Sequence, residues 1–269
     1  AFKYLILGAL ASAVLLYGIA LVYGATGSTN LTEVQAFLGA NLLTNNLLLL
    51  AGMAMILAGL AFKVAAAPFH AWAPDVYEGS PSPIVAYMAS GVKVAGFAAL
   101  VRVFVVAFGS YRADWQPVVY VLAVATLLVG SILSVQQTNV KRLLAYSSIS
   151  HAGFMLLGIQ AGTVEGVQAL AFYLATYTFT VAGSFGVATV VGRRGDNAHD
   201  LSHYRGLGKR APLVAFAFLV FLLAQAGVPF TSGFLAKLYT VIASIAAQAT
   251  WLAIVAMVST WLLARESSS

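Results

Sequence analysis

The chain has no cysteine among its 269 residues and carries very little charge. Without thiols it can form no disulfide, no thiolate zinc site and no cysteine-ligated iron–sulfur cluster, so we expect redox chemistry to happen in other chains. Charged residues make up only 8% of the sequence, whereas soluble domains carry about 25%. This deficit excludes an ordinary soluble domain.

The sequence is instead rich in apolar residues. They make up 61% of the chain, the mean hydropathy is +0.91, and blocks of about twenty apolar residues recur along the whole length, so neither a signal peptide nor a single anchor explains them. Ala, Leu and Val run on without the alternation of a membrane β-strand. The sequence therefore predicts an all-α, polytopic membrane protein.

Apolar runs between turn-rich breaks predict eight transmembrane spans in a single membrane-embedded domain covering 1–269. These spans are 3–24, 42–64, 83–107, 115–137, 140–160, 164–192, 211–246 and 248–264.

The loops between these spans differ in charge from one side of the membrane to the other. One side collects nine cations and the other only Arg112, an asymmetry that predicts a cytoplasmic location for the first side. The nine are Lys3, Lys141, Arg142, Arg193, Arg194, Arg205, Lys209, Arg210 and Arg265. The polar stretch 193–210 reads either as an ordinary cytoplasmic loop or as a docking site for an acidic partner or lipid.

Four cations remain inside predicted spans, and three of them are lysines: Lys63, Lys93 and Lys237. The fourth, Arg102, is near a span end and can reach the membrane surface. Each buried cation costs roughly 2.5–3.5 kcal/mol at a helix centre. All eight acids of the chain fall in loops or at span ends, so either the lysines pair with carboxylates elsewhere or they exchange protons.

Helix-breaking residues lie close to two of these lysines. Pro68 follows Lys63 by five residues, and Gly227 and Pro229 precede Lys237. Broken helices at membrane depth occur against protein or a water-filled cavity, and they recur at transport sites. Two breaks, each beside a buried lysine, point to a transport path.

The span 140–160 carries polar side chains that could pass protons along such a path. Tyr146, Ser147, Ser150 and His151 place hydroxyls and an imidazole on successive helical turns. Hydrogen bonding between helices explains the same residues equally well.

Four segments resemble subunit N of proton-pumping NADH:quinone oxidoreductases: Phe62–Gly79, Asn139–His151, Tyr204–Leu207 and Gly227–Lys237. The wider family includes the antiporter-like subunits of the same complex and of multisubunit cation/proton antiporters. The Asp-Val-Tyr-Glu-Gly sequence at Asp75–Gly79 favours subunit N.

The resemblance implies fourteen helices built around two inverted five-helix repeats, each with one discontinuous helix. It implies that Lys63 is the broken-helix lysine that pairs with a glutamate, Lys93 the central lysine, and Lys237 the lysine of the second broken helix. That glutamate would precede Ala1, so we expect a partial chain that lacks N-terminal helices and the C-terminal end of the family.

The function implied is proton translocation along buried lysines and water, driven by quinone reduction elsewhere, in a subunit of a translocase. We expect no redox or nucleophilic active site, bound cofactor or metal in this chain, and NADH, FMN, iron–sulfur clusters and quinone in other subunits. Expected partners are the other membrane-arm subunits, including antiporter-like ones, and the lipid bilayer, with no nucleic acid. The expected location is the bacterial plasma (inner) membrane rather than an organellar membrane. The alternatives are a subunit of a multisubunit cation/proton antiporter and a non-conducting membrane scaffold.

Overall fold

A computed structural model describes residues 2–41, 46–192, 196 and 199–266, with side chains of the last helix described as far as residue 261. Every named element in these residues is a helix. The α-helices are α1 (Phe2–Thr26), α2 (Leu31–Ala40), α3 (Leu47–Lys63), α4 (Ala73–Gly79), α5 (Ser82–Ala89), α6 (Gly91–Leu100), α7 (Arg112–Ser134), α8 (Val140–Ala161), α9 (Val164–Gly192), α10 (Leu201–Tyr204), α11 (Leu207–Arg210), α12 (Pro212–Ala226), α13 (Ser232–Ala246) and α14 (Thr250–Glu266). A π-helix, Val101–Ala107, follows α6, and a short 3-10 helix, Gly109–Tyr111, precedes α7.

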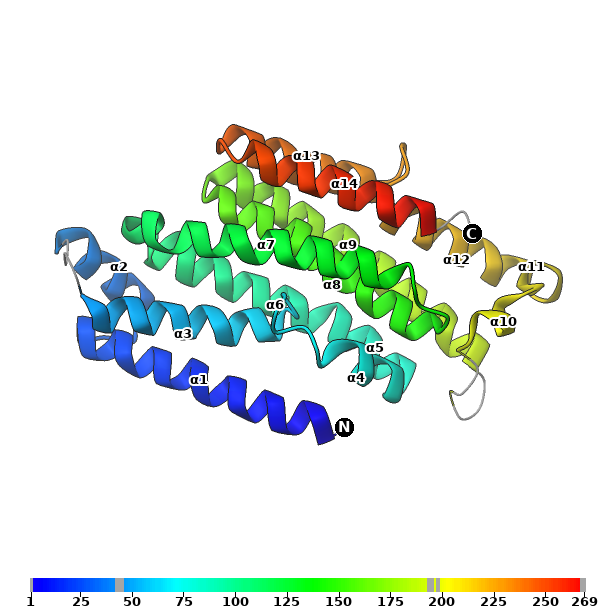
Figure 1. Cartoon of the computed structure of the whole chain (residues 1–269), viewed down its shortest axis with the longest axis horizontal. Coiled ribbons are helices and arrows are strands. Elements are labelled where there is room, and N and C mark those ends of the chain that lie inside the picture. Colours follow the sequence, from blue (N-terminus) through cyan, green and yellow to red (C-terminus); the bar gives the residue numbers. More distant parts are fainter. Residues whose placement is uncertain (1, 42–45, 193–195, 197–198, 267–269) are drawn as a thin grey trace.

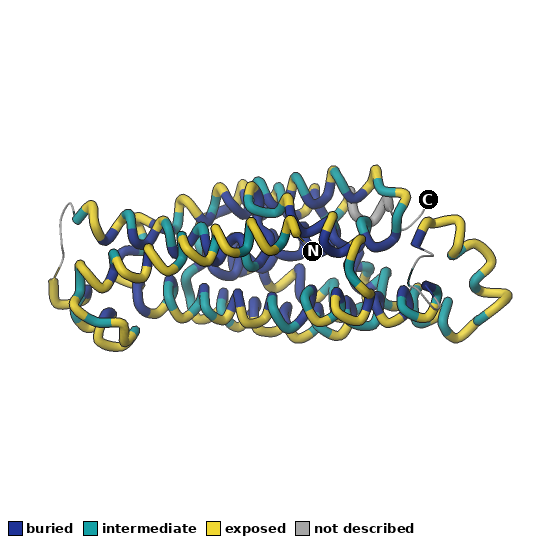
Figure 2. Tube along the Cα trace, turned by 90° about the horizontal axis from the view of Figure 1, so that it is seen from below, coloured by how far each residue is buried: buried dark blue, intermediate teal, exposed yellow. Residues whose placement is uncertain are grey.

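The long helices lie side by side in one bundle (Figure 1). Helices α7, α8 and α9 occupy the middle, α1 and α3 pair on one side, and α13 and α14 cover the other side. Figure 2 shows buried residues along the inside of the bundle and exposed residues over its outer surface. Among the described residues, four helical stretches are long and apolar enough to cross a membrane: 2–26, 82–107, 109–134 and 164–192.

Helix α8 lies at the centre of the bundle. Every residue from Ser147 to Ala161 is buried, as expected for a helix that is surrounded by other helices. Glycines allow this closeness, because a Cβ at Gly130 of α7 would collide with the backbone of Ser150, and a Cβ at Gly153 would lie 2.9 Å from the backbone nitrogen of Leu127. By contrast, Gly18 and Val22 are the buried residues of α1.

The first interruption separates α3 from α4. Residues 64–72 leave the helix around the predicted break at Pro68. Two hydrogen bonds compensate for lost helical ones: the Ala67 N–H donates to Thr126 Oγ1 at 2.9 Å, and Trp72 Nε1 donates to the Phe62 carbonyl at 3.1 Å.

The second interruption divides the predicted span 211–246 into α12 and α13. Gly227 ends α12 in the left-handed region with φ +81°, and Phe230 follows at φ +73°. Thr231 then starts α13, its Oγ1 accepting a hydrogen bond from the Phe234 N–H at 3.3 Å. The non-helical residues coincide with the breaks predicted at Gly227 and Pro229.

The predicted span 83–107 is also less regular than a single helix. The backbone turns at Ser90, whose Oγ donates to the Ala86 carbonyl at 2.6 Å, and the helix widens into the π-helix after Leu100. π-Helical turns are rare and often lie at functional sites. Lys93 sits on α6 between these two irregularities. Residues 42–45 of the predicted span 42–64 lie outside the described residues.

Candidate functional site

Lys93 is one of two lysines in the middle of the bundle and is only 2% exposed. Its Nζ donates to both the Oγ of Ser148, at 2.6 Å, and the backbone carbonyl of the same residue. Tyr177 of α9 donates its own hydroxyl to Ser148 Oγ at 2.8 Å, and its ring centre lies 5.7 Å from the lysine Nζ. Ser148 therefore joins α6, α8 and α9 at one point.

The partners of Lys93 are neutral oxygens and a ring face. In the described part of the chain, the ion pairs of Asp75, Glu78 and Asp196 involve other cations, and none reaches Lys93. Among these residues, no carboxylate of the same chain therefore neutralises Lys93. A lysine solvated by neutral groups can give up and regain a proton without leaving a carboxylate unpaired.

His151 lies one turn along α8 from Ser148. Its Nδ1 shares a hydrogen bond of 2.7 Å with the Tyr173 hydroxyl, and its ring centre is 4.9 Å from that of Tyr177. Its other ring nitrogen, Nε2, is buried and has no hydrogen-bond partner among the described residues. The imidazole is thus fixed on one side and open on the other.

Lys237 is the other lysine in the middle of the bundle, and it is 4% exposed. Its Nζ donates to the carbonyl of Ala226 at 2.9 Å and lies 5.0 Å from the Phe154 ring centre. Ala226 is the last residue of α12, so its carbonyl has no partner within the helix and carries the negative end of the helix dipole. The break therefore supplies the ligand that holds this ammonium.

Lys63 differs from the other two lysines because it is only partly buried. It is the last residue of α3 and makes no hydrogen bond or ion pair with the described residues. A Cβ on Gly96 of α6 would lie 3.9 Å from its Cβ, so Lys63 and Lys93 stand on adjacent helices. Its pairing with a glutamate stays a prediction.

The other predicted relay residues, Ser150, Ser147 and Tyr146, do not all lie on the side of α8 that carries His151. Ser150 binds the hydroxyls of Ser131 and Ser259, at 3.0 and 3.2 Å, on the side of α8 that faces α7 and α14. Ser147 is buried and Tyr146 partly buried. Successive helical residues point about 100° apart, so Ser150 cannot share the side of α8 that His151 presents to α9.

Sequence reasoning did not single out Ser148 or Gln225. Ser148 stands three residues before His151, the spacing of helix neighbours, but Ser147 at four residues satisfies the same rule. Gln225 is a lone amide in an apolar run, 5% exposed, and its Nε2 donates to Ser184 Oγ at 2.7 Å and to the Thr180 carbonyl at 3.3 Å.

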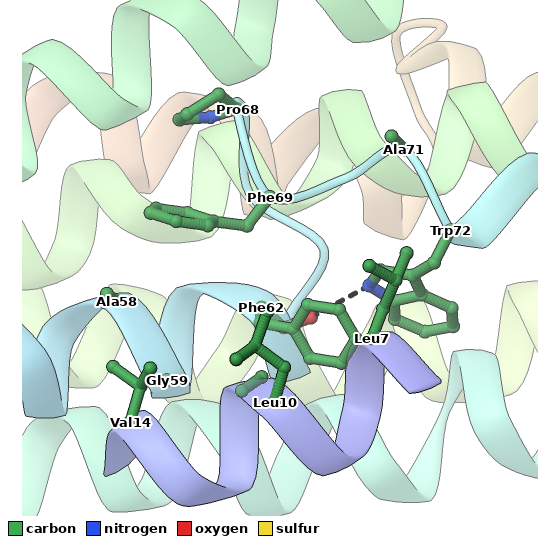
Figure 3. A pocket seen from close by; sticks show the side chains of 11 residues that line it. Leu7, Leu10, Val14, Ala58, Gly59, Phe62, Pro68, Phe69, Ala71 and Trp72 are labelled. Atoms are coloured by element: carbon green, nitrogen blue, oxygen red, sulfur yellow. Dashed lines mark hydrogen bonds between the residues drawn. The ribbon is translucent and has the colours of Figure 1, made fainter. Parts of the chain in front are cut away.

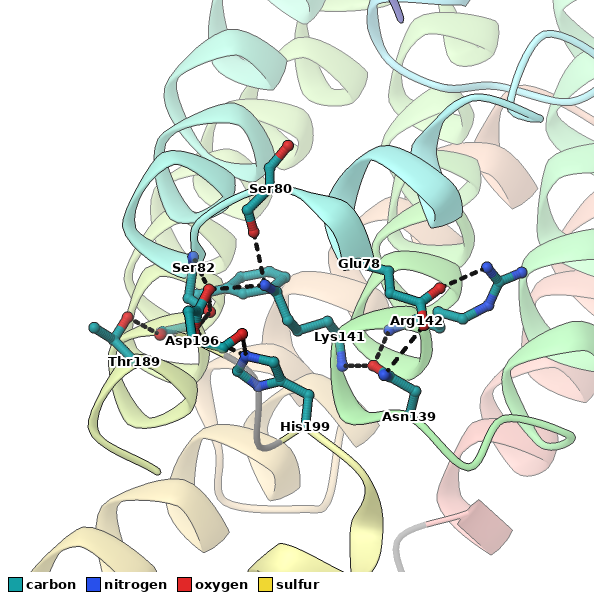
Figure 4. A network of polar contacts seen from close by, with 10 residues as sticks. Glu78, Ser80, Ser82, Asn139, Lys141, Arg142, Thr189, Asp196 and His199 are labelled. Carbon is teal, nitrogen blue, oxygen red and sulfur yellow. Dashed lines mark hydrogen bonds and ion pairs between the residues drawn. The ribbon is translucent and has the colours of Figure 1, made fainter. Parts of the chain in front are cut away.

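A charge network occupies the end of the bundle where α1 and α8 begin (Figure 4). Arg142 binds Asp75 at 2.9 Å and Glu78 at 2.8 Å, and Lys3 also binds Asp75. This network gives the resemblance motif Asp75–Gly79 a structural role, because both of its carboxylates fix α4 to the start of α8.

Lys141 departs from its expected place as a loop cation, since its side chain is only 1% exposed. Its Nζ donates to the Ser80 carbonyl at 2.6 Å and pairs with Asp196 at 2.9 Å, and Asp196 also accepts from Ser82 and from His199 (Figure 4). Burial raises the pKa of Asp196, but hydrogen bonds from Lys141 and Ser82 outweigh it and bring that pKa to about 2. Arg193 and Arg194 lie outside the described residues.

An apolar pocket of about 250 Å³ opens beside the first break (Figure 3). Leu7 and Leu10 of α1 face Phe62, Phe69 and Trp72 across it. These side chains can receive hydrocarbon, but they offer no group that could carry a proton.

Comparison with known proteins accounts for this arrangement. Residues 1–263 match the family described as "NADH:quinone oxidoreductase/Mrp antiporter, TM". The chain belongs to this family. The predicted fold class, with membrane helices and two interrupted spans, is thereby confirmed.

Members named NADH-quinone oxidoreductase subunit N are similar over most of this chain. The protein of Parafrankia sp. (strain EAN1pec) is 47% identical over 96% of the chain and 49% of its own length, and that of Mycobacterium bovis is 46% identical over 96% and 49%. The chain thus spans about half the length of these relatives.

The fold is also shared with solved structures, among them the following two. A chain of respiratory complex I from Thermus thermophilus has a TM-score of 0.83 and 38% identity, covering 99% of this chain and 57% of its own. A chain of the Mrp complex from Dietzia sp. has a TM-score of 0.89 and 29% identity, covering 99% and 48%.

Proposed function

We propose that this chain is part of a proton-translocating membrane subunit of an NADH:quinone oxidoreductase, and that Lys93 and Lys237 carry the protons through it. One observation supports this most: two fully enclosed lysines, held by neutral oxygens, face the same helix α8 from different sides. Each stands beside an irregular stretch of helix. The similarity to proteins named subunit N supplies the oxidoreductase context.

The proposed path runs from Lys93 through Ser148 and Tyr177 to His151, and from there to Lys237. Lys63 lies on the helix next to Lys93 and extends the path toward the first break. Energy for transport comes from quinone reduction in other subunits, where the redox cofactors also reside. This chain then changes the charge and hydration of its lysines and makes or breaks no substrate bond.

The proposed setting is the bacterial plasma membrane, with other membrane-arm subunits as neighbours. Exposed apolar side chains on α12, Leu213 and Phe216 among them, provide surface for such subunits or for lipid.

Replacement of Lys93 tests the proposal. In vesicles that contain the whole complex, Lys93→Ala should reduce NADH-driven proton uptake by roughly a hundredfold or more, because a positioned proton-transfer group contributes about that factor. Lys209→Ala, which removes an exposed lysine of α11, is the matched control. Normal pumping by an assembled Lys93→Ala complex would contradict the proposal.

A cation/proton antiporter subunit is the second candidate, favoured by the similarity to the Mrp complex chain. It predicts sodium-dependent proton movement without NADH, which vesicle assays with and without NADH distinguish. The scaffold alternative predicts that Lys93→Ala impairs assembly and leaves the pumping of the assembled complex intact.

A further inference from the structure

The Nε2 atom of His151 has no hydrogen-bond partner among the described residues. The residue is 3% exposed, and this atom is buried. Buried polar atoms nearly always find a partner in the protein or in an ordered water molecule.

A small cavity adjoins the imidazole. Its volume is about 10 Å³, and its lining includes His151 of α8, Tyr177 and Thr180 of α9, Gln225 of α12 and Ala236 of α13. A single water molecule needs about 10–15 Å³. The cavity is therefore large enough for one water molecule and too small for a lipid chain or an organic ligand.

Gln225 gives this cavity a second polar wall. Its Nε2 is held by Ser184 Oγ and the Thr180 carbonyl, at 2.7 and 3.3 Å. With the nitrogen committed to α9, the amide oxygen is the part of the side chain that remains free to accept a hydrogen bond. A water molecule in the cavity could then accept from or donate to His151 Nε2 and donate to this oxygen.

We propose that an ordered water molecule binds between His151 and Gln225, and that Gln225 is the residue that positions it. The role of this site rests on the proposed function. The water would connect His151, which packs against Tyr177 beside Lys93, with the break between α12 and α13 that holds Lys237. Gln225 directly precedes Ala226, whose carbonyl binds Lys237, and Ala236 directly precedes Lys237 itself. The cavity is thus lined by Tyr177, whose ring lies against Lys93, and by residues next in sequence to Ala226 and Lys237.

The water itself is tested by a map of the whole complex at a resolution that shows ordered solvent. We expect density within 2.6–3.2 Å of His151 Nε2 and within hydrogen-bonding distance of Gln225, and loss of that density in Gln225→Leu. A dry cavity in the wild-type map overturns the proposal, whatever the pumping assays show.

The role of Gln225 is tested by a pair of leucine variants. Gln225→Leu should slow NADH-driven proton uptake by roughly tenfold or more, whereas Gln160→Leu, at an equally buried glutamine (5% exposed) away from the cavity, should not. Gln225→Glu in its protonated form keeps one accepting oxygen and one donor at the same reach and should restore most of the rate, which a purely structural role would not predict. Ser184→Ala, which removes one of the two groups that hold the amide nitrogen, should give an intermediate rate.

Equal pumping by Gln225→Leu and wild type would overturn the positioning role. If Gln225→Leu does not assemble, Ser184→Ala decides in its place, and an unchanged rate there would equally count against the proposal. Failure of the proposed function has a different signature, because it appears as full activity of Lys93→Ala while the density at His151 persists.

Discussion

At the scale of single residues, the feature with most consequence is the contact between Gly227 and Lys237. A Cβ on Gly227 would lie 2.9 Å from the lysine Cδ, and the backbone there has φ +81°. Glycine is therefore required at this position for two reasons: the backbone adopts a positive φ, and there is no room for a Cβ. The ammonium reaches the end of α12 only because no side chain intervenes.

Gly227→Ala should displace Lys237 from the Ala226 carbonyl and lower stability by roughly 1–3 kcal/mol. Gly206→Ala provides the matched control, since Gly206 has a similar φ of +70° with nothing near a built Cβ. Both variants share the backbone strain, so thermal unfolding in detergent should shift in both. Proton uptake should fall in Gly227→Ala alone, and equal uptake in the two would refute a role for this contact.

The sequence could predict the placement of some site residues in the fold but not of others. The burial of Lys93 and Lys237 follows from a charged residue inside an apolar run, and the breaks follow from Pro68, Gly227 and Pro229. The choice of Ser148 over Ser147 and Ser150 depends on the rotation of α8 within the bundle, which three neighbouring serines leave undetermined.

At the scale of elements, the two interrupted helices are stabilised by groups far away in the sequence. The Ala67 N–H, freed by the first break, is taken up by Thr126 of α7, 59 residues later. Because a threonine inside an apolar helix has no distinctive pattern, the sequence could place the break but not the residue that stabilises it.

Thr126→Val, which is nearly equal in shape, should leave this buried N–H unpaired and destabilise the protein by about 1–3 kcal/mol. Thr178→Val serves as control, since among the described residues the Thr178 hydroxyl donates only to the Leu174 carbonyl of its own helix. The melting temperatures of the two variants are compared by thermal unfolding of the purified complex. A similar loss in both variants would mean that the hydroxyl of Thr126 contributes nothing specific to the break.

At the scale of the whole molecule, the cations Lys3, Lys141 and Arg142 lie at the same end of the bundle. The sequence predicted that these cations share a side of the membrane, and α1 and α8 do begin at the same end (Figure 1). It did not predict that Lys141 would be buried against Asp196, because 55 residues separate the pair. This pair joins Asp196 to the start of α8.

The stability of this end should depend on pH through Asp196. Its pKa in the folded protein is about 2, below the ordinary 3.8, so the stabilisation is complete above about pH 4 and is lost as the pH falls toward 2. Asp196→Asn should lower the melting temperature at pH 6, because it leaves Lys141 buried without its carboxylate. The two melting curves should converge as the pH approaches 2.

Asp200→Asn is the control, since Asp200 is an exposed acid that caps α10. Its difference from wild type at pH 6 should be much smaller than that of Asp196→Asn. A constant gap between Asp196→Asn and wild type down to pH 2.5 would show that the carboxylate charge is not what stabilises this end.

The complete burial of α8 from Ser147 to Ala161 has a consequence for its backbone. Amide hydrogens exchange with solvent only when a segment opens, and from Ser147 to Ala161 every residue of α8 is covered by other helices. Deuterium should therefore enter α1 and α12 long before it enters α8. The helix on which the proposed path depends would then be the slowest part of the molecule to exchange its own amide protons, while the side chains of Ser148 and His151 pass protons at every turnover.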